Sequence, residues 1–384
     1  KLSFFFNFGL LLKRVFDIMW KKQSLTILLL FGLMLARVGA QDDNQHESNS
    51  NSHEEDKVFN PGTFILDHVM DSYDWHILTV GDTHISIPLP VILISKSKGF
   101  HIFLSSRFHH GHSAYKGFMI AQDGPNEGSI VEVDEHGHVD ENAKLPLDFS
   151  ITKTVFAMLI SFLLMIWIFL SVAKRYKKNP NRPPKGIQAL MEPIILFVRD
   201  DIAIPSIGEK RYERFMPYLL TVFFFIILNN YLGVIPFPPG GANVTGNIAV
   251  TAVLALLTFI ITTFSTNKGY WKHIFNAPGV PWWLKFPVPL MPFIELLGVF
   301  TKPLVLCIRL FANILAGHFI ILSFVALIFI FGQIHWIAGY GVSFISVLFY
   351  VFMTLLEFLV AFIQAYVFTL LSALYFGMAK EEAH

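Results

Sequence analysis

The chain has 384 residues, of which 54% are hydrophobic and only 15% are charged, and its formal net charge is +1. This composition excludes a soluble domain built around one large core and is typical of a protein with several membrane-spanning segments. The balanced charge gives no indication of nucleic-acid binding, and the single cysteine, Cys307, excludes an intramolecular disulfide bond.

Residues 1–40 have the pattern of a secretory signal. Met19 is followed by two lysines, an apolar stretch and small residues that end at Ala40, which suits cleavage by signal peptidase. We expect translation to start at Met19 and the mature protein to begin at Gln41. An uncleaved anchor helix is the alternative, and N-terminal sequencing of the mature protein separates the two.

Two segments of different composition follow. Residues 41–57 are polar and acidic, and they predict a disordered linker because they have almost nothing to bury. Residues 58–150 alternate short β-favouring runs with turn residues, which predicts a small β-containing region. Eleven of the 15 histidines lie between Gln41 and Ser150. They suit either metal or proton buffering or a solvated surface, and without cysteines or ordered ligand spacing we predict no metal site.

Residues 151–384 form the predicted membrane domain. Its apolar segments with about the length of a membrane-spanning helix are 154–173, 215–235, 248–264, 292–331 and 342–378. The last two exceed a perpendicular crossing, so we expect a tilted helical hairpin that turns near residues 333–341. Residues 186–201 predict an amphipathic helix at the cytoplasmic face. The predicted fold class is an all-α polytopic membrane protein with about five transmembrane helices and a small β-containing external region.

Charged residues predict the orientation of these helices. Lysine and arginine crowd residues 174–214 but are absent from residues 236–247 and 333–341. The positive-inside rule therefore places residues 174–214 and the C-terminus in the cytoplasm and the histidine-rich region outside. The signal segment agrees with this orientation of a multi-pass membrane protein, and the family resemblance given below implies that the membrane is a bacterial inner membrane.

A polar stripe interrupts the first long helix. Glu295, Lys302, Arg309 and Asn313 follow one another at intervals of seven, seven and four residues, which places them on one helix face. An ionisable side chain at membrane depth is costly and usually serves a pathway or a partner charge, and arginine stays charged at any physiological pH. An arginine that extends to the lipid headgroups and a coincidental stripe are the alternatives.

The returning helix carries Glu357 and Gln364, which are also seven residues apart. His318 lies nine residues, about 13 Å, outward of Arg309, and Glu357 lies seven residues, about 10 Å, outward of Gln364. If Arg309 and Gln364 lie at the same depth in an antiparallel hairpin, His318 therefore lies near the depth of Glu357. A carboxylate beside an imidazole suits a proton relay, and a static hydrogen bond that holds the hairpin is the alternative. Nine residues also place His318 on the opposite side of the helix from Arg309.

At these residues the sequence resembles a known family. Arg309-Leu-Phe-Ala-Asn313, with Lys302-Pro303 upstream and Ala316-Gly317 just after, is similar to the signature of subunit a of the F-type ATP synthase. The resemblance extends from about residue 154 to the C-terminus. It implies a stator protein that binds no cofactor and lies against the ring of c subunits. The implied partners are also the b subunits, the lipid bilayer and, through the complex, the soluble F1 head, where the ATP chemistry takes place.

The resemblance also implies a role for each polar residue. Arg309 separates two aqueous half-channels, with His318 and Glu357 lining the outer one and Glu295 in the inner one. Gln364 and Asn313 orient the arginine. The secondary candidates, at positions where the family carries polar or basic residues, are Asn230, Asn243 and Lys302. For the two asparagines, interhelical hydrogen bonding is the alternative. In well-known bacterial members the acid and the histidine of the outer pair are exchanged.

Two other functions are compatible with the composition. A self-contained secondary transporter or metal permease suits the histidine-rich external region, but such folds usually contain an internal repeat, which this sequence lacks. A structural anchor without conduction leaves the polar stripe unexplained. Co-purification with a c ring and an ATPase head separates both from a stator subunit. The sequence does not identify the coupling ion.

Overall fold

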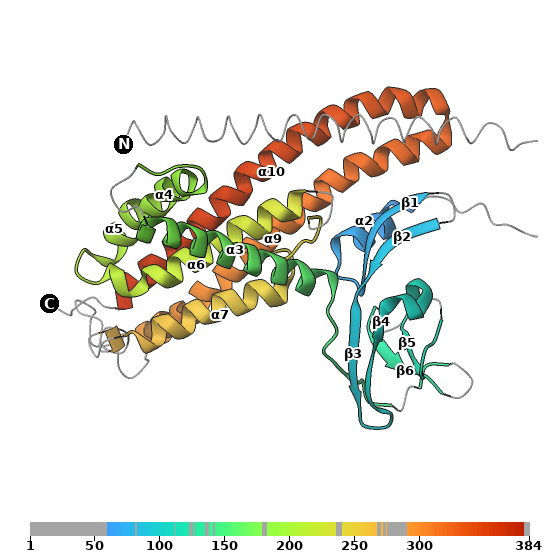
Figure 1. The fold of residues 1–384 in the computed structure, drawn as a ribbon, viewed down its shortest axis with the longest axis horizontal. Coiled ribbons are helices and arrows are strands. Elements are labelled where there is room, and N and C mark those ends of the chain that lie inside the picture. The colour runs from blue at the N-terminus through green and yellow to red at the C-terminus, as the bar shows by residue number, and fades with distance from the viewer. Residues whose placement is uncertain are drawn as a thin grey trace, which may run out of the picture.

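The computed structural model describes residues 60–379 except for gaps at 81–82, 112, 123–125, 127, 135–137, 141–142, 179–182, 236–239, 267–269, 272–273 and 275–289. The predictions for the signal segment and for the linker at residues 41–57 fall outside the described residues. In the described part, a β-rich region precedes a layer of long helices (Figure 1).

The β-rich region is built from short elements. These are α2 (Pro61–Val69), β1 (Asp74–Val80), β2 (Thr83–Pro88), β3 (Pro90–Ser95), β4 (Gly99–Leu104), the 3-10 helix η1 (Ser105–Gly111), β5 (Phe118–Ile120), β6 (Ile130–Glu132) and β7 (Leu147–Asp148). The strands form three antiparallel sheets, β1–β2, β4–β3–β7 and β5–β6. Alternate residues of β3, Val91 and Leu93, point into a core with Phe108 and Phe118. The predicted small β-containing region is confirmed.

The helical part follows directly. Its elements are α3 (Lys153–Lys178), α4 (Ile187–Phe197), the π-helix η2 (Val198–Ala203), α5 (Ile204–Ile207), α6 (Tyr212–Val234), α7 (Ile248–Phe264), α9 (Leu290–Ile334) and α10 (Trp336–Ala379). In the described part, α3, α6, α9 and α10 are long and apolar enough to cross a membrane, and α7 is a shorter apolar helix. The predicted all-α polytopic fold is confirmed.

Helices α9 and α10 form the predicted long hairpin, but its turn is much tighter than expected. The sequence predicted a turn near residues 333–341, and His335, which separates the two helices, lies in that segment, so the position of the turn is confirmed. Two glycines explain the tight crossing: a Cβ atom on Gly339 would lie 2.8 Å from the Cα atom of Gly332. Without side chains at these positions, the two backbones approach closely enough for the helices to meet almost directly.

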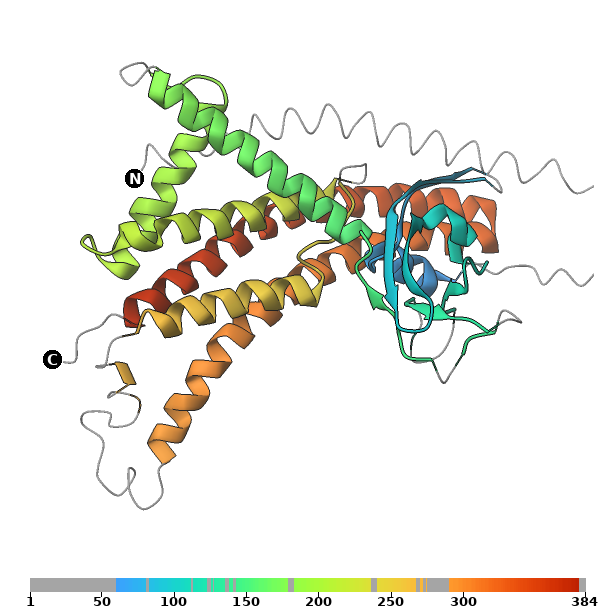
Figure 2. The ribbon, with the colours of Figure 1, turned by 60° about the horizontal axis from the view of Figure 1, so that its bottom comes forward.

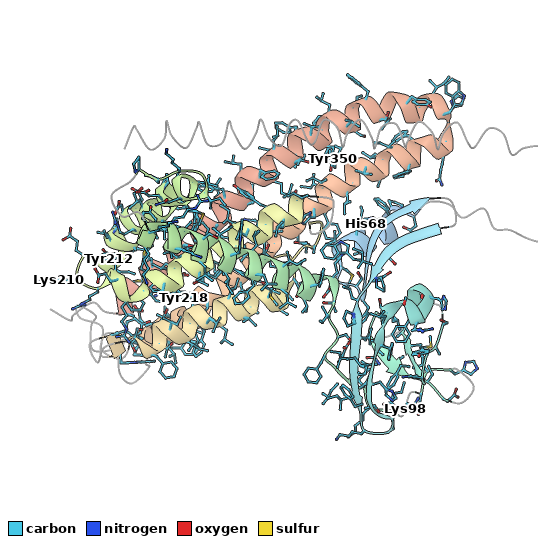
Figure 3. The ribbon with its side chains drawn as sticks, in the orientation of Figure 1. His68, Lys98, Lys210, Tyr212, Tyr218 and Tyr350 are labelled. Carbon is cyan, nitrogen blue, oxygen red and sulfur yellow. The ribbon has the colours of Figure 1, made fainter. Side chains whose placement is uncertain are left out.

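The helix predicted over residues 186–201 is present and extends further. It continues from α4 through η2 into α5, and Val198 and Ile202 are fully buried. Both η2 and α5 pack against the C-terminal part of α10. Helix α3 begins beside the β-rich region, and its basic last turn lies at the opposite end of the molecule, as Figure 2 shows. Figure 3 shows the same arrangement, with Lys210 and Tyr212 at one end and His68 and Lys98 at the other.

The β-rich region is attached to the helices through α2. This helix packs along α9, where the rings of Phe64 and Phe329 lie 6.0 Å apart. The backbone N–H of Thr154 donates to the carboxylate of Asp71 at 2.9 Å, and that of Lys153 donates to the carbonyl of Ser72 at 2.9 Å. Since Asp71 satisfies an N–H that helical hydrogen bonding leaves free, the β-rich region caps the N-terminal end of α3.

Candidate functional site

Helix α9 presents two chemically different faces. Leu306, Leu310 and Ile314 recur at helical spacing and are buried against the neighbouring helices. Arg309 and Asn313 lie on another face and are exposed. Among the described residues, Arg309 has no ion pair and no hydrogen bond to Asn313 or to Gln364, which is buried on α10. The orienting contacts expected for Arg309 are therefore absent from the described part of the chain, and the roles of Gln364 and Asn313 stay predictions.

His318 and Glu357 meet between α9 and α10. The Nδ1 atom of His318 lies 3.5 Å from Oε1 of Glu357, and the two side chains are 16% and 3% exposed. Gly317 makes this approach possible, because a Cβ atom there would lie 3.0 Å from the same carboxylate oxygen. The proximity predicted from the residue spacing along the hairpin is thus present in the structure.

Several buried polar atoms on α6, α10 and the segment between α6 and α7 make no hydrogen bond within the described part of the chain. Among the described residues, they are both carboxylate oxygens of Glu357, Oδ1 of Asn229 and Nδ2 of Asn243. Gly233 lies against both the His318 ring and the carbonyl of Ala242, so the connection between α6 and α7 reaches the pair. Burying a polar atom without a hydrogen bond costs about 1–3 kcal/mol. A site that tolerates several such atoms is suited to groups that exchange protons or hydrogen bonds.

Asn230 and Asn243 hold the same region together. The Asn230 amide donates to the carbonyl of Ala361 on α10 at 3.5 Å and accepts from the hydroxyl of Thr245. Asn243 accepts from the backbone N–H of Gly246 at 2.9 Å. Asn230 therefore makes the interhelical hydrogen bonds that were the alternative to a direct role, and its position beside the pair leaves the direct role open.

Lys153 is a candidate that the sequence reasoning missed. It is only 7% exposed at the start of α3, and its ammonium donates to the carbonyl of His68 at 3.4 Å. Lys153 therefore lies where the β-rich region meets the first turn of α3, and its hydrogen bond joins α3 to α2. A lysine at the outer end of a span, where the positive-inside rule predicts few cations, was the available signal.

Lys302 lies two helical turns inward of Arg309. Its ammonium lies 5.7 Å from the centre of the Tyr375 ring on α10, within the range of a cation–π contact. The charge of Arg309 also acts on Tyr375. The sequence reasoning did not single out this tyrosine, because nothing in the periodicity of α10 predicts which of its aromatic residues faces α9.

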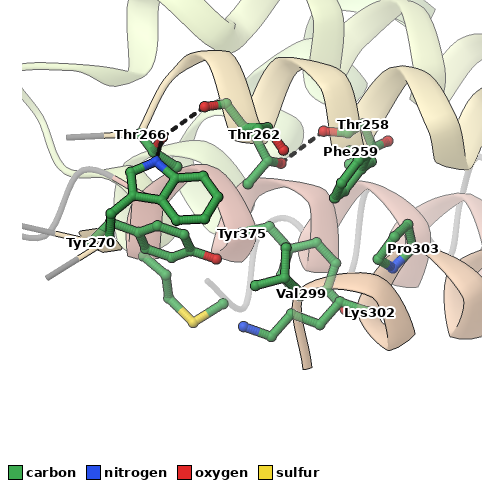
Figure 4. Close-up of a pocket in the computed structure, with 12 residues that line it drawn as sticks. Thr258, Phe259, Thr262, Thr266, Tyr270, Val299, Lys302, Pro303 and Tyr375 are labelled. Carbon is green, nitrogen blue, oxygen red and sulfur yellow. Dashed lines mark hydrogen bonds between the residues drawn. The ribbon is translucent and has the colours of Figure 1, made fainter. Parts of the chain in front are cut away.

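A small cavity opens between α7, α9 and α10, near the C-terminal ends of α7 and α10 (Figure 4). Its volume of about 20 Å³ is enough for a water molecule. One wall is a ladder of hydroxyl groups on and just after α7, contributed by Thr258, Thr262 and Thr266. Opposite them are Lys302 and Pro303. Because proline has no N–H, it cannot donate to the carbonyl of the residue four positions earlier, Val299, which also lines the cavity.

Glu295 lies near the same cavity. Burial and then the charge of Glu295 raise the pKa of Tyr270, whose side chain lines the cavity. Lys302 therefore lines the cavity, whereas Glu295, two helical turns before it on α9, acts on a residue that lines it. Asn313 and Arg309 lie further along α9, outside the set of residues that line it.

The histidines of the β-rich region form no recognisable site in the described part. Among the residues that the structure places, no group of three or more His, Cys, Asp or Glu side chains could hold a metal ion.

Comparison with known proteins identifies the family of the helical part. Residues 155–377, more than half of the chain, match the family model described as ATP synthase A chain. The chain belongs to the ATP synthase A chain family. It is a multi-pass membrane protein of the ATP synthase membrane sector. This membership disfavours both the permease and the simple anchor.

Individual relatives agree. ATP synthase subunit a of Chloroherpeton thalassium is 44% identical over 249 residues, covering 62% of this chain and 70% of the relative. The subunit a of Chlorobium phaeobacteroides is 42% identical over 287 residues, covering 69% and 80%. That of Myxococcus xanthus is 44% identical over 245 residues, covering 62% and 75%. A second family model, described only as a domain of unknown function, matches residues 64–149.

Proposed function

We propose that the chain is the proton-translocating stator subunit of an F-type ATP synthase and that it faces the rotating ring of c subunits. One observation carries this proposal: α9 bears an exposed guanidinium on one face and, nine residues further, a buried imidazole–carboxylate pair on another. A stator needs both, because a proton must reach the rotor from one side of the membrane without crossing directly to the other.

The outer half-channel ends at His318 and Glu357. Protons arrive from outside past Asn230, Asn243 and the buried Lys153, and the pair passes them on, since imidazole and carboxylate can each hold and release a proton. The 3.5 Å separation of the two side chains supports this path, because groups this close can exchange a proton directly or through one water molecule. The proton then neutralises a carboxylate on a c subunit, which can rotate into the lipid.

The inner half-channel follows the cavity between α7, α9 and α10. Glu295 lies about 21 Å inward of Arg309 along the helix axis. The hydroxyl ladder of Thr258, Thr262 and Thr266 supplies polar groups along the wall. A c-subunit carboxylate that completes its turn releases its proton into this path toward the cytoplasm.

Arg309 separates the two paths. Its permanent charge favours the ionised carboxylate of the approaching c subunit, which drives proton release, and repels a proton that would pass straight through. Its exposure supports this role, because a guanidinium in a membrane helix requires an anionic partner and the described part of this chain supplies none.

The complex that this function requires consists of the c ring, the b subunits of the peripheral stalk and the soluble F1 head. The chain itself then contributes conduction and no catalysis. The orientation that fits places the basic end of α3 and the end of α10 in the cytoplasm of a bacterium and residues 58–150 outside, as one domain ahead of the membrane domain at residues 151–384.

The test is ATP-driven proton uptake into inverted membrane vesicles that carry Arg309→Ala or Arg309→Lys. Co-purification of the c ring and F1 head establishes that each variant assembles. We expect both assembled variants to lose at least about 10²-fold in pumping, equivalent to ~3 kcal/mol. The lysine fails as well because it keeps the charge but loses the planar fork. Wild-type pumping by either assembled variant contradicts the role given to the guanidinium.

A further inference from the structure

The sheet β4–β3–β7 has two apolar faces. Its inner face covers the core that contains Val91 and Leu93. Ile92 and Ile94 alternate with them along β3 and point the other way, and the strand register pairs Ile94 with both Phe100 and Leu147. The outer sheet face consists of the exposed side chains Ile94, Phe100, Ile102, Leu104, Leu147 and Phe149.

Such a face is unusual in water. An antiparallel sheet with one solvated face normally alternates apolar inward and polar outward residues. Here the outward positions of three neighbouring strands are apolar, and Phe100 and Phe149 are 64% and 62% exposed. A contiguous apolar surface of this kind marks a contact with another molecule or with a membrane.

The position of the sheet identifies what it contacts. The backbone N–H of Phe149 donates to Ile92 and that of Ile151 to Pro90, both at 2.9 Å, so β3 is bonded to the segment that leads into α3. Helix α3 begins at Lys153 and is apolar enough to span a membrane, with exposed residues such as Leu163 along its length. The apolar surface therefore continues from a membrane-facing helix, through Phe149, onto the outer sheet face.

The direction in which the face points agrees with a bilayer. Figures 1 and 2 show β5 on the side of β3 and β4 that is away from α3 and α7. The inner face is turned toward β5, so the outer sheet face is turned to the side of the membrane helices. Figure 1 also shows the β3–β4 hairpin extending past α7 instead of lying across its end. A helix that spans a bilayer begins near the bilayer surface, and for α3 this point is Lys153, close to the sheet.

The rim of the face carries cations. Lys96, in the turn between β3 and β4, and Lys144, shortly before β7, are both exposed. Aromatic and aliphatic side chains flanked by lysines are typical of segments that rest in the headgroup region of a bilayer, where the lysines meet lipid phosphates.

We propose that the outer sheet face rests on the outer surface of the lipid bilayer and anchors the β-rich region there. The region would then hold α2 and Lys153 in a fixed position at the outer end of α3. This inference depends on membrane insertion of α3 and not on the proton path, so failure of the pumping experiment above leaves it untouched.

The test uses the full-length protein with Cys307→Ser, reconstituted in nanodiscs of phosphatidylcholine and phosphatidylglycerol. Spin labels are placed at Ile102→Cys or Leu147→Cys on the outer sheet face. Asn126→Cys, an exposed position in a loop of the same region, is the solvent control, and Leu163→Cys on α3 is the lipid control. Collision rates with oxygen, which partitions into lipid, are compared with those of a water-soluble nickel complex.

We expect both face labels to resemble the Leu163 label, with oxygen accessibility exceeding that of the nickel complex, and the Asn126 label to show the reverse. The two labelled positions lie on different strands, so the second still reports on the face if the first variant folds poorly. Labels that resemble the Asn126 label overturn the proposal, because the face is then in water. Labels that neither reagent reaches also overturn it, because another protein segment then covers the face.

Discussion

The two polar sites on α9 differ in what surrounds them. Arg309 is exposed and finds no anionic partner in the described part of the chain, whereas His318 is largely buried and meets Glu357 from α10. Both members of the buried pair come from this one chain. The exposed arginine is incomplete, because a charge at membrane depth needs a counter-charge. One helix therefore carries a site whose two members lie in this chain and a site whose partner we propose to lie on another subunit.

The largest effect expected at the buried site comes from Glu357→Gln. It removes the carboxylate but keeps the shape, and we expect ATP-driven pumping to fall about 10²-fold, which is typical for loss of a proton-transfer group. The measurement is proton uptake into inverted vesicles, with assembly established by co-purification.

The exchanged double variant His318→Glu with Glu357→His is the matched control. It keeps one imidazole and one carboxylate at the same place, in the arrangement that the family resemblance implies for other bacterial members. We expect it to pump better than either single variant. If the double variant pumps no better than the single variants, the imidazole and the carboxylate are not interchangeable members of a relay. The proton-transfer role given to His318 and Glu357 is then contradicted.

A smaller effect is expected where the β-rich region meets the outer end of α3. Asp71→Ala removes the acceptor for the N–H of Thr154 and an anion that acts on Lys153. We expect a loss of about 1–2 kcal/mol of local stability, as for other helix caps. Amide hydrogen exchange across α2 and the first turn of α3 measures it. Asp71→Asn keeps an acceptor and should lose less, and equal protection in Asp71→Ala and wild type would show that this cap contributes nothing.

The smallest effect is expected for Thr245→Val. This substitution removes the hydroxyl that donates to Asn230 and leaves a buried amide oxygen without that partner. We expect the free energy of unfolding to fall by about 1 kcal/mol, seen as a lower thermal midpoint of the purified complex. Pumping should stay close to wild type. Comparison with Asn230→Ala separates the two roles of the asparagine: if Asn230→Ala loses pumping and Thr245→Val does not, Asn230 acts directly in the path.

Much of this arrangement could be predicted from sequence because it depends on local periodicity. Hydropathy predicted the spans, and residue spacing predicted both the opposite faces of Arg309 and His318 and the depth shared with Glu357. Contacts between elements distant in the chain could not be predicted in the same way. The burial of Lys153 depends on how α2 packs against α9, and the tight turn at His335 depends on Gly332 meeting Gly339.

The most direct measurement is photo-crosslinking from the exposed face of α9 in the assembled complex. A benzophenone maleimide is attached at Ala312→Cys, which lies on the face of Arg309, in a Cys307→Ser background, with Leu163→Cys on α3 as the matched lipid-facing control. We expect the label at position 312 to crosslink to a c subunit and the label at position 163 to give no such product. A complex that retains its c ring but gives no c-subunit product from position 312 would contradict the claim that this face meets the rotor.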